Sequence, residues 1–282
     1  MDSPNPRSRP GRIESTPTEI PEELFDLAPL ASHVCVLTGA GMSAESGIPT
    51  FRDPTHGLWE NYNPEDLVSV QGWQADPHLV WAWHLWFQRL CASCEPNAGH
   101  RALGRWARLA NTSAAPKIDI VTQNIDDLHE RGGSEVLAHL HGDISTLRCA
   151  DCGLVTDKHA LAPTNPASFP AEDAPRIPPP RCTTCGGYIR HSVTWFGEAL
   201  PTEAIDRAMT SAMTCDLMIV IGTSGSVYPA AGLPRLAADR GVPVVEINPR
   251  DTELTASMDV VWREGAAVAL PALVAVLIDH HR

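Results

Sequence analysis

The sequence has 282 residues, of which 43% are hydrophobic and 20% are charged. This composition is that of an ordinary globular protein that can bury a sizeable core. The net charge of −13, from 21 basic and 34 acidic side chains, disfavours direct nucleic-acid binding because phosphate contacts need clustered Lys and Arg. No apolar run approaches the roughly 18–20 residues of a membrane span, and the N-terminus lacks the apolar stretch of a secretory signal. We therefore expect a cytoplasmic protein without a membrane partner.

Residues 1–20 are rich in Pro, Ser, Arg and Glu without hydrophobic periodicity, which predicts a disordered tail. Short apolar runs then predict buried strands at residues 33–38, 118–122, 136–140, 217–221, 242–247 and 260–262. Helical patterns lie between several of these runs, at residues 78–91, 100–109, 203–213, 230–239 and 266–278. This alternation predicts an α/β fold with a parallel sheet covered by helices on both faces.

Two stretches interrupt the alternation of strands and helices. Residues 60–115 are helical and rich in Trp, with no predicted strand. Residues 144–194 contain paired cysteines and a proline-rich loop at 162–180. We interpret both stretches as insertions that build a second, smaller domain on the main sheet.

A glycine-rich turn follows the first predicted strand. The residues Gly39, Ala40, Gly41, Ser43 and Ala44 fit the G-x-G-x-x-G/A pattern, in which glycines let backbone N–H groups approach a pyrophosphate. A plain strand-to-helix turn is the alternative. In a dehydrogenase a second strand should end in an acidic residue about 20 positions later, and none is predicted there. An ordinary nicotinamide oxidoreductase is therefore disfavoured.

Four of the eight cysteines form two Cys-x-x-Cys pairs, each followed by Gly: Cys149, Cys152, Cys182 and Cys185. Four thiolates complete the tetrahedral shell of zinc and leave no position for water, so the predicted metal is one structural Zn²⁺. Four unliganded thiols are the alternative. Cys91 and Cys94 share the spacing but end an apolar helical segment, which favours buried helix-end cysteines over a second metal or redox pair.

Polar residues directly follow the carboxyl ends of two neighbouring predicted strands, and α/β sheets bind ligands at this edge. His141 follows one strand and can accept a proton near neutral pH. Asn124 and Asp126 follow the other strand and suit recognition of a nicotinamide carboxamide and a ribose hydroxyl; a helix N-cap is the alternative for either. We interpret the nearby His129 and His139 as structural.

The fifteen residues 39–53 resemble the cofactor loop of the sirtuin family of NAD-dependent protein-lysine deacylases. Besides the two cysteine pairs, further similar segments follow in the family's order: Thr122-Gln-Asn-Ile-Asp126, His141-Gly-Asp143, Trp195-Phe-Gly-Glu198, Gly222-Thr-Ser224 and Glu246-Ile-Asn248. The resemblance covers roughly residues 25–280. It implies a Rossmann-like NAD-binding domain (21–60, 116–143 and 195–282), with a helical insert (61–115) and a zinc-binding module (144–194) forming the smaller domain.

The resemblance also implies roles for individual residues. His141 would be the general base for a ribose hydroxyl, and Asn124 would orient the ribose or a water. The implied NAD contacts are Gly39, Ala40, Gly41, Ser43, Ala44, Ile48, Phe51, Arg52, Gln123, Asn124, Ile125, Asp126, Gly222, Thr223, Ser224, Asn248 and Ala266. The implied contacts to an acyl-lysine protein or peptide are His84, Phe87, Val193, Trp195, Phe196, Gly197 and Glu198. The products would be nicotinamide, O-acyl-ADP-ribose and free lysine. Separately, we expect the protein to be a monomer.

One departure from the family concerns the acyl group. The segment 222–231 is most similar to the branch that removes succinyl groups, whose Tyr-x-x-Arg pairs with the acyl carboxylate. In this sequence His84 and Phe87 occupy those positions, and Arg89 lies elsewhere on the helix. Because a buried carboxylate without a cation is costly, we expect acetyl or other neutral acyl groups to be preferred.

The alternative functions for the whole protein are a mono-ADP-ribosyltransferase, an NAD hydrolase, a non-catalytic NAD sensor and, least favoured, a zinc-ribbon nucleic-acid binder.

Overall fold

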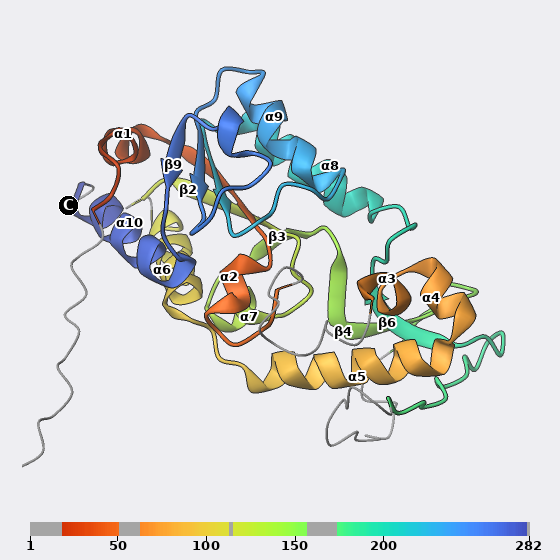
Figure 1. Cartoon of the computed structure of the whole chain (residues 1–282). Coiled ribbons are helices and arrows are strands. Elements are labelled where there is room, and N and C mark those ends of the chain that lie inside the picture. The colour runs from red at the N-terminus through yellow and green to blue at the C-terminus, as the bar shows by residue number, and fades with distance from the viewer. Residues whose placement is uncertain (1–18, 51–62, 113–114, 157–173, 281–282) are drawn as a thin grey trace, which may run out of the picture.

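The computed structural model describes residues 19–50, 63–112, 115–156 and 174–280. Its larger part is a six-stranded sheet with the strand order β3–β2–β1–β7–β8–β9, and every neighbouring pair is parallel (Figure 1). The strands are β1 (His33–Thr38), β2 (Lys117–Thr122), β3 (Val136–His139), β7 (Leu217–Ile221), β8 (Val244–Ile247) and β9 (Val260–Trp262). The predicted parallel α/β fold is confirmed.

Side chains on the two faces of this sheet enter two separate hydrophobic clusters, because successive residues of a strand point in opposite directions. Val34 and Val36 face one cluster, whereas Cys35 and Leu37 face the other. The first face is covered by α1 (Glu22–Leu27), η1 (Ala28–Leu30), α6 (Ala98–Ala110) and α10 (Ala266–His280). The second face is covered by α8 (Thr202–Thr214), η3 (Ala230–Gly232) and α9 (Leu233–Ala238). A further short helix, η4 (Thr255–Ser257), precedes β9.

The smaller part combines a helical layer with a three-stranded antiparallel sheet of order β5–β4–β6. Its elements are α3 (Pro64–Leu67), α4 (Val70–Ala75), α5 (Pro77–Ser93), β4 (Gly142–Cys149), β5 (Val155–Thr156) and β6 (Ile189–Val193). Asp76 caps α5 by accepting a hydrogen bond from the Leu79 N–H, with 3.0 Å between the heavy atoms. Trp81 of α5 packs with Leu147 and Ile189 of the small sheet, and Figure 1 shows α5 running along that sheet.

The position of α6 corrects one predicted boundary. We placed the whole of residues 61–115 in the smaller domain, but α6 packs along α10 of the larger one. Leu103 and Trp106 are fully buried in the cluster on the first face of the large sheet. The helical insert therefore ends before α6, since apolar burial decides to which core a helix belongs.

The remaining predictions about chain organisation meet the structure only in part. The predicted disordered tail (1–20) lies mostly in residues 1–18, and the proline-rich loop (162–180) lies partly in residues 157–173, both outside the described residues. The segment in which no second strand was predicted also lies mostly outside the described residues, at 51–62. Within the described part of the chain, no helix has the length and apolarity that crossing a membrane requires.

Candidate active site

The glycine turn after β1 packs directly on the backbone of the turn after β7. Gly41 N–H donates to the carbonyl oxygen of Gly222 over 2.8 Å. A Cβ on Gly39 would lie 2.8 Å from the backbone of Thr223, and a Cβ on Gly41 would lie 2.7 Å from that of Gly222. Gly222 itself has φ +60°, a conformation that other residues rarely adopt. The glycines thus allow the turns after β1 and β7 to pack against each other. Helix α2 (Gly41–Ala44) begins at this contact.

A buried hydrogen-bond network joins this turn to the end of β2. Asn124 Nδ2 donates to Ser43 Oγ over 3.1 Å, and Ser43 Oγ donates to Asp126 Oδ2 over 3.0 Å. Asp126 Oδ1 also accepts from the N–H of Leu128, which begins α7 (Leu128–Arg131). Burial raises the pKa of Asp126 above its usual value, although the hydrogen bonds from Leu128 and Ser43 oppose the shift. Three of the predicted cofactor contacts therefore form one connected cluster.

His141 lies between the two sheets, after β3 and directly before β4. Its Nδ1 is 2.8 Å from the carbonyl oxygen of Gln123. A carbonyl only accepts, so Nδ1 carries the proton and Nε2 is left as a base. Burial lowers the pKa of His141 below its usual value, although the bond to Gln123 opposes the shift. The imidazole is thus held neutral at neutral pH with its basic nitrogen defined, as general-base chemistry requires.

The competing histidines near His141 have structural partners. His139 Nε2 is 2.8 Å from Glu130 Oε1. Burial lowers the pKa of His139, but the Glu130 carboxylate outweighs this effect and raises it overall. His129 is fully buried, and its Nε2 is 3.0 Å from Thr38 Oγ1. Both rings are thus engaged by neighbouring side chains.

The ends of β7 and β8 meet beside the glycine turn. Asn248 Nδ2 donates to the carbonyl oxygen of Thr223 over 3.1 Å, and Gln123 Nε2 donates to Thr223 Oγ1 over 2.9 Å. Ser224 bonds to the hydroxyl of Ser226 over 2.7 Å. Ala266 begins α10 and is buried at the edge of the core. The structure thus gathers these predicted contacts at the carboxyl edge of the sheet, where open α/β sheets bind ligands.

The apolar predicted contacts lie between the two domains. Ile48 packs in a cluster that includes Trp195, with Ile125 and Phe87 partly buried against it. This cluster would line the nicotinamide and acyl end of a binding site. The predicted contacts Phe51 and Arg52 lie outside the described residues.

Arg190 organises the predicted substrate segment, and the sequence analysis did not identify it. It forms two parallel hydrogen bonds with Glu198, of 2.6 and 3.0 Å, and donates to the carbonyl oxygen of Val193 over 2.5 Å. Its guanidinium carbon lies 3.1 Å from the ring centroid of Trp195. Burial opposes ionisation of Glu198, but Arg190 and the Trp195 N–H outweigh it and lower the pKa of Glu198. The available signal was Arg190 itself, the one Lys or Arg in β6.

Phe196 and Gly197 form the exposed tip of this segment. The backbone of Phe196 pairs with the chain before α4: its N–H donates to Val68 over 2.8 Å, and its carbonyl accepts from Val70 over 3.1 Å. Its side chain is 49% exposed, an unusual state for Phe. Gly197 has φ +91°, so the turn at this tip favours glycine.

The predicted substrate contact His84 is buried rather than exposed. The side chain is only 1% exposed; Nδ1 donates to the Val80 carbonyl over 2.8 Å, and Nε2 accepts from Trp195 Nε1 over 3.2 Å. Burial lowers the pKa of His84 to about 4, so the ring is neutral at neutral pH. Phe87, one turn further along α5, is half-buried and stacks on Trp83 with 5.1 Å between ring centroids. Neither predicted acyl contact offers a cation.

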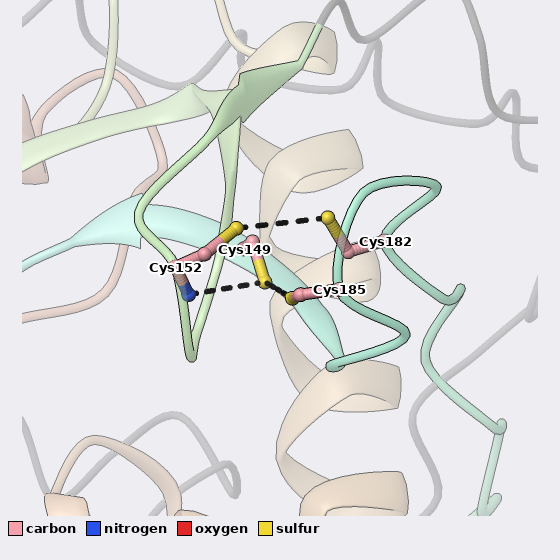
Figure 2. A group of neighbouring side chains, drawn as sticks. All are labelled: Cys149, Cys152, Cys182 and Cys185. Carbon is pink, nitrogen blue, oxygen red and sulfur yellow. Dashed lines mark hydrogen bonds between the residues drawn. The ribbon is translucent and has the colours of Figure 1, made fainter.

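The two cysteine pairs meet at the end of β4 and the loop before β6. Figure 2 shows the four side chains drawn together, and their sulfur atoms all lie within 4.8 Å of one another. The Sγ atoms of Cys149 and Cys185 are 3.4 Å apart, and those of Cys152 and Cys182 are 3.8 Å apart. Tetrahedral zinc with bonds of about 2.3 Å needs sulfurs roughly 3.8 Å apart. The four cysteines therefore fit one structural Zn²⁺.

Local geometry explains the glycine after each cysteine pair. Gly153 has φ +73° and Gly186 has φ +77°, so both turns use the left-handed region that favours glycine. Cys91 and Cys94 are buried at the end of α5 and are not among the residues of the metal-binding cluster found in the described part of the chain. Burial raises the pKa of both thiols, which agrees with their interpretation as helix-end core residues.

Together these features define an α/β protein with a glycine turn at the carboxyl edge of its parallel sheet, a buried neutral histidine and a four-cysteine cluster that fits zinc. The model of the Sir2 family matches residues 39–229. An NAD-dependent protein deacylase of Corynebacterium glutamicum is 46% identical over 252 residues, covering 89% of this chain and 94% of that protein. The corresponding deacylase of Mycobacterium tuberculosis H37Rv is 48% identical over 242 residues, with 86% and 96% covered. The chain belongs to the Sir2 family, the sirtuins.

Solved structures agree with this assignment. A Sir2 homologue in complex with NAD has a TM-score of 0.81 at 38% sequence identity, with 95% of this chain and 98% of that chain covered. A Sir2 protein bound to a p53 peptide and NAD⁺ has a TM-score of 0.74 at 27% identity, with 90% and 97% covered. The predicted Rossmann-like domain with a zinc-bearing smaller domain is therefore the fold of this chain.

Proposed function

We propose that this protein is an NAD-dependent protein-lysine deacylase that prefers acetyl or other neutral acyl groups. Its relatives carry the name NAD-dependent protein deacylase, and a similar Sir2 homologue binds NAD. The observation that carries the proposal is His141, whose proton is fixed on Nδ1 by Gln123, which leaves Nε2 as a base. NAD, as co-substrate, supplies the ribose hydroxyl and the leaving nicotinamide.

The chain's own residues would bind, orient and shield the reactants. Asn124 and Asp126, held together by Ser43, would fix the ribose and the carboxamide, because their positions are already set before any ligand arrives. Ile48 would line the pocket for the nicotinamide, and Phe51 would keep released nicotinamide from returning to the reacting carbon. Arg52, Gln123 and the turns after β1 and β7 would hold the rest of NAD. His141 would accept the proton of a ribose hydroxyl as that oxygen attacks the acyl carbon.

The substrate would be an acyl-lysine in an extended peptide. The peptide would contact Val193, Trp195, Phe196, Gly197 and Glu198. Because the Phe196 backbone already pairs with Val68 and Val70, strand pairing with the peptide would use the other backbone groups of this segment. The Sir2 complex with a p53 peptide supports this class of substrate. We further propose a cytoplasmic monomer. Four thiolates that fit zinc suit a reducing compartment, and light scattering of the purified protein would test the mass.

Product analysis tests the proposed activity. The protein is incubated with NAD and an acetyl-lysine peptide, and the products are identified by mass spectrometry. Nicotinamide, O-acetyl-ADP-ribose and free lysine are expected in equal amounts. A modified protein would instead indicate mono-ADP-ribosyl transfer, plain ADP-ribose would indicate NAD hydrolysis, and binding without turnover would indicate a sensor.

The acyl preference leads to a separate prediction. We expect kcat/KM for an acetyl-lysine peptide to exceed that for the matching succinyl-lysine peptide roughly ten- to hundredfold, because a buried carboxylate would meet no cation from His84 or Phe87. Phe87→Arg should narrow or reverse this ratio by supplying a cation. Phe87→Leu is the matched control and should leave the ratio unchanged. Faster desuccinylation by the unaltered protein would contradict the preference.

A further inference from the structure

A buried chain of hydrogen bonds runs beneath the active site and ends at Asn124. His129 Nε2 is 3.0 Å from Thr38 Oγ1, Thr38 Oγ1 donates to Thr122 Oγ1 over 2.8 Å, and Thr122 Oγ1 accepts from the N–H of Asn124 over 3.0 Å. His129, Thr38 and Thr122 have no exposed surface at all. In such a fully buried chain the loss of one hydrogen-bond partner is costly, because water cannot replace it.

The direction of these bonds assigns the proton on His129. Thr38 has one hydroxyl hydrogen and gives it to Thr122, so toward His129 its oxygen can only accept. His129 must therefore donate from Nε2, which leaves Nδ1 without a proton. Burial lowers the pKa of His129 well below its usual value, which agrees with a neutral ring.

The chain joins the two strand ends that carry the reacting groups. Thr38 is the last residue of β1 and immediately precedes the glycine turn, while Thr122 is the last residue of β2 and precedes Gln123 and Asn124. The N–H of Gln123 also donates to the Thr38 carbonyl over 2.9 Å. A fixed Thr38–Thr122 contact therefore sets where Asn124 lies relative to the cofactor loop.

We infer that His129, in its neutral Nε2–H form, is a positioning residue that holds Asn124 in its reactive place through Thr38 and Thr122. The inference rests on the proposed deacylase activity and adds a role for a histidine that touches neither substrate. Removing the donor frees the Thr38 hydroxyl to turn, and Asn124 then loses a fixed anchor while keeping its bond to Ser43.

The neighbouring His100 provides a matched control. Its ring is also fully buried and lies 5.0 Å from that of His129 between centroids. Its Nδ1 accepts from the N–H of Asn97, 3.3 Å away, so it belongs to the N-terminal cap of α6. Loss of this imidazole should lower stability without disturbing Asn124.

Kinetics of six full-length proteins test the inference: wild type, His129→Leu, His129→Gln, Thr38→Val, Thr38→Ser and His100→Leu. We expect His129→Leu and Thr38→Val to lower kcat roughly tenfold, with KM for the peptide within about twofold. His129→Gln and Thr38→Ser keep a donor and a hydroxyl and should stay within about threefold of wild type. His100→Leu should lower the melting temperature yet keep kcat. Wild-type kcat in folded His129→Leu and Thr38→Val would overturn the positioning role.

A spectroscopic measurement on the wild-type protein tests the same inference without turnover. Nitrogen-15 NMR of the imidazoles in the wild-type protein at neutral pH should show a neutral buried histidine with the proton on Nε2 whose signal is lost in His129→Gln. His100, whose Nδ1 also accepts a hydrogen bond, should give a separate signal that remains in that variant. A proton on Nδ1 would reverse the chain and overturn the inference. Because this result is independent of catalysis, it separates failure of the inference from absence of deacylation in the wild type, which would instead reject the proposed function.

Discussion

Replacing His141 with Ala is expected to lower acyl-dependent NAD consumption roughly 10²–10⁴-fold, the usual contribution of a general base. The physical reason is the geometry of its ring: Gln123 fixes the proton on Nδ1, so that Nε2 is the base presented to the ribose. The measurement is formation of O-acetyl-ADP-ribose with time. Nicotinamide release by exchange should survive better, because bond cleavage to nicotinamide precedes the step that needs the base.

His139→Gln is the matched control for that experiment. His139 is two residues away; its ring pairs with Glu130 and contacts the main-chain carbonyl of Asn124, without a role in the proposed proton transfer, so its loss should change the rate less than about threefold. If His141→Ala formed O-acetyl-ADP-ribose at the wild-type rate, the proposed chemistry would be rejected.

The same residue predicts the acid side of the pH profile. A base must be unprotonated to act, and burial lowers the pKa of His141 in the folded protein below about 6.5. Activity should therefore persist below the pH at which an exposed histidine is half protonated, and fall only at lower pH. The measurement is kcat/KM as a function of pH. An acid limb centred above that pH would contradict this assignment of the base.

Removing the zinc is expected to unfold the smaller domain and abolish activity. Cys149→Ser deletes one of four ligands, and the three-stranded sheet has only a small core of its own to replace them. We expect loss of several kcal/mol of stability and a melting temperature lower by roughly 10 °C or more. The measurements are zinc content by mass spectrometry and thermal unfolding by circular dichroism.

The effect should reach the active site because β4 connects the two. β4 begins at Gly142, directly after His141, and ends at Cys149. Cys94→Ala is the control: it removes a buried thiol outside the cluster and should retain one zinc per chain. A Cys149→Ser protein with one bound zinc and an unchanged melting temperature would show that the site is not a four-cysteine zinc site.

The parts of this protein that the sequence predicted well are those encoded by neighbouring residues. Continuous apolar runs mark strands buried on both faces, as in β7, where every residue is buried. The cysteine pairs predict their metal because two residues of spacing suffice to direct two thiolates to one ion. His141 and Asn124 could be placed at one sheet edge because parallel strands put their carboxyl ends together.

Only the tertiary structure decided the contacts between segments distant in the chain. The amphipathic pattern of α6 predicts an apolar face but does not say which core this face joins. The structure shows that α6 packs on the large sheet. In the sequence Arg190 is only a charged residue, and the tertiary structure shows that it binds Glu198 and packs on Trp195. In the sequence, nothing distinguishes His84 and His129 from the other histidines. Only their burial beside particular partners keeps these two rings neutral and determines which nitrogen carries the proton. The sequence by itself thus determined the elements and the chemistry available at their ends. Folding decided which of those groups are desolvated, paired and held in place, because burial and hydrogen bonding depend on neighbours that the local pattern does not specify.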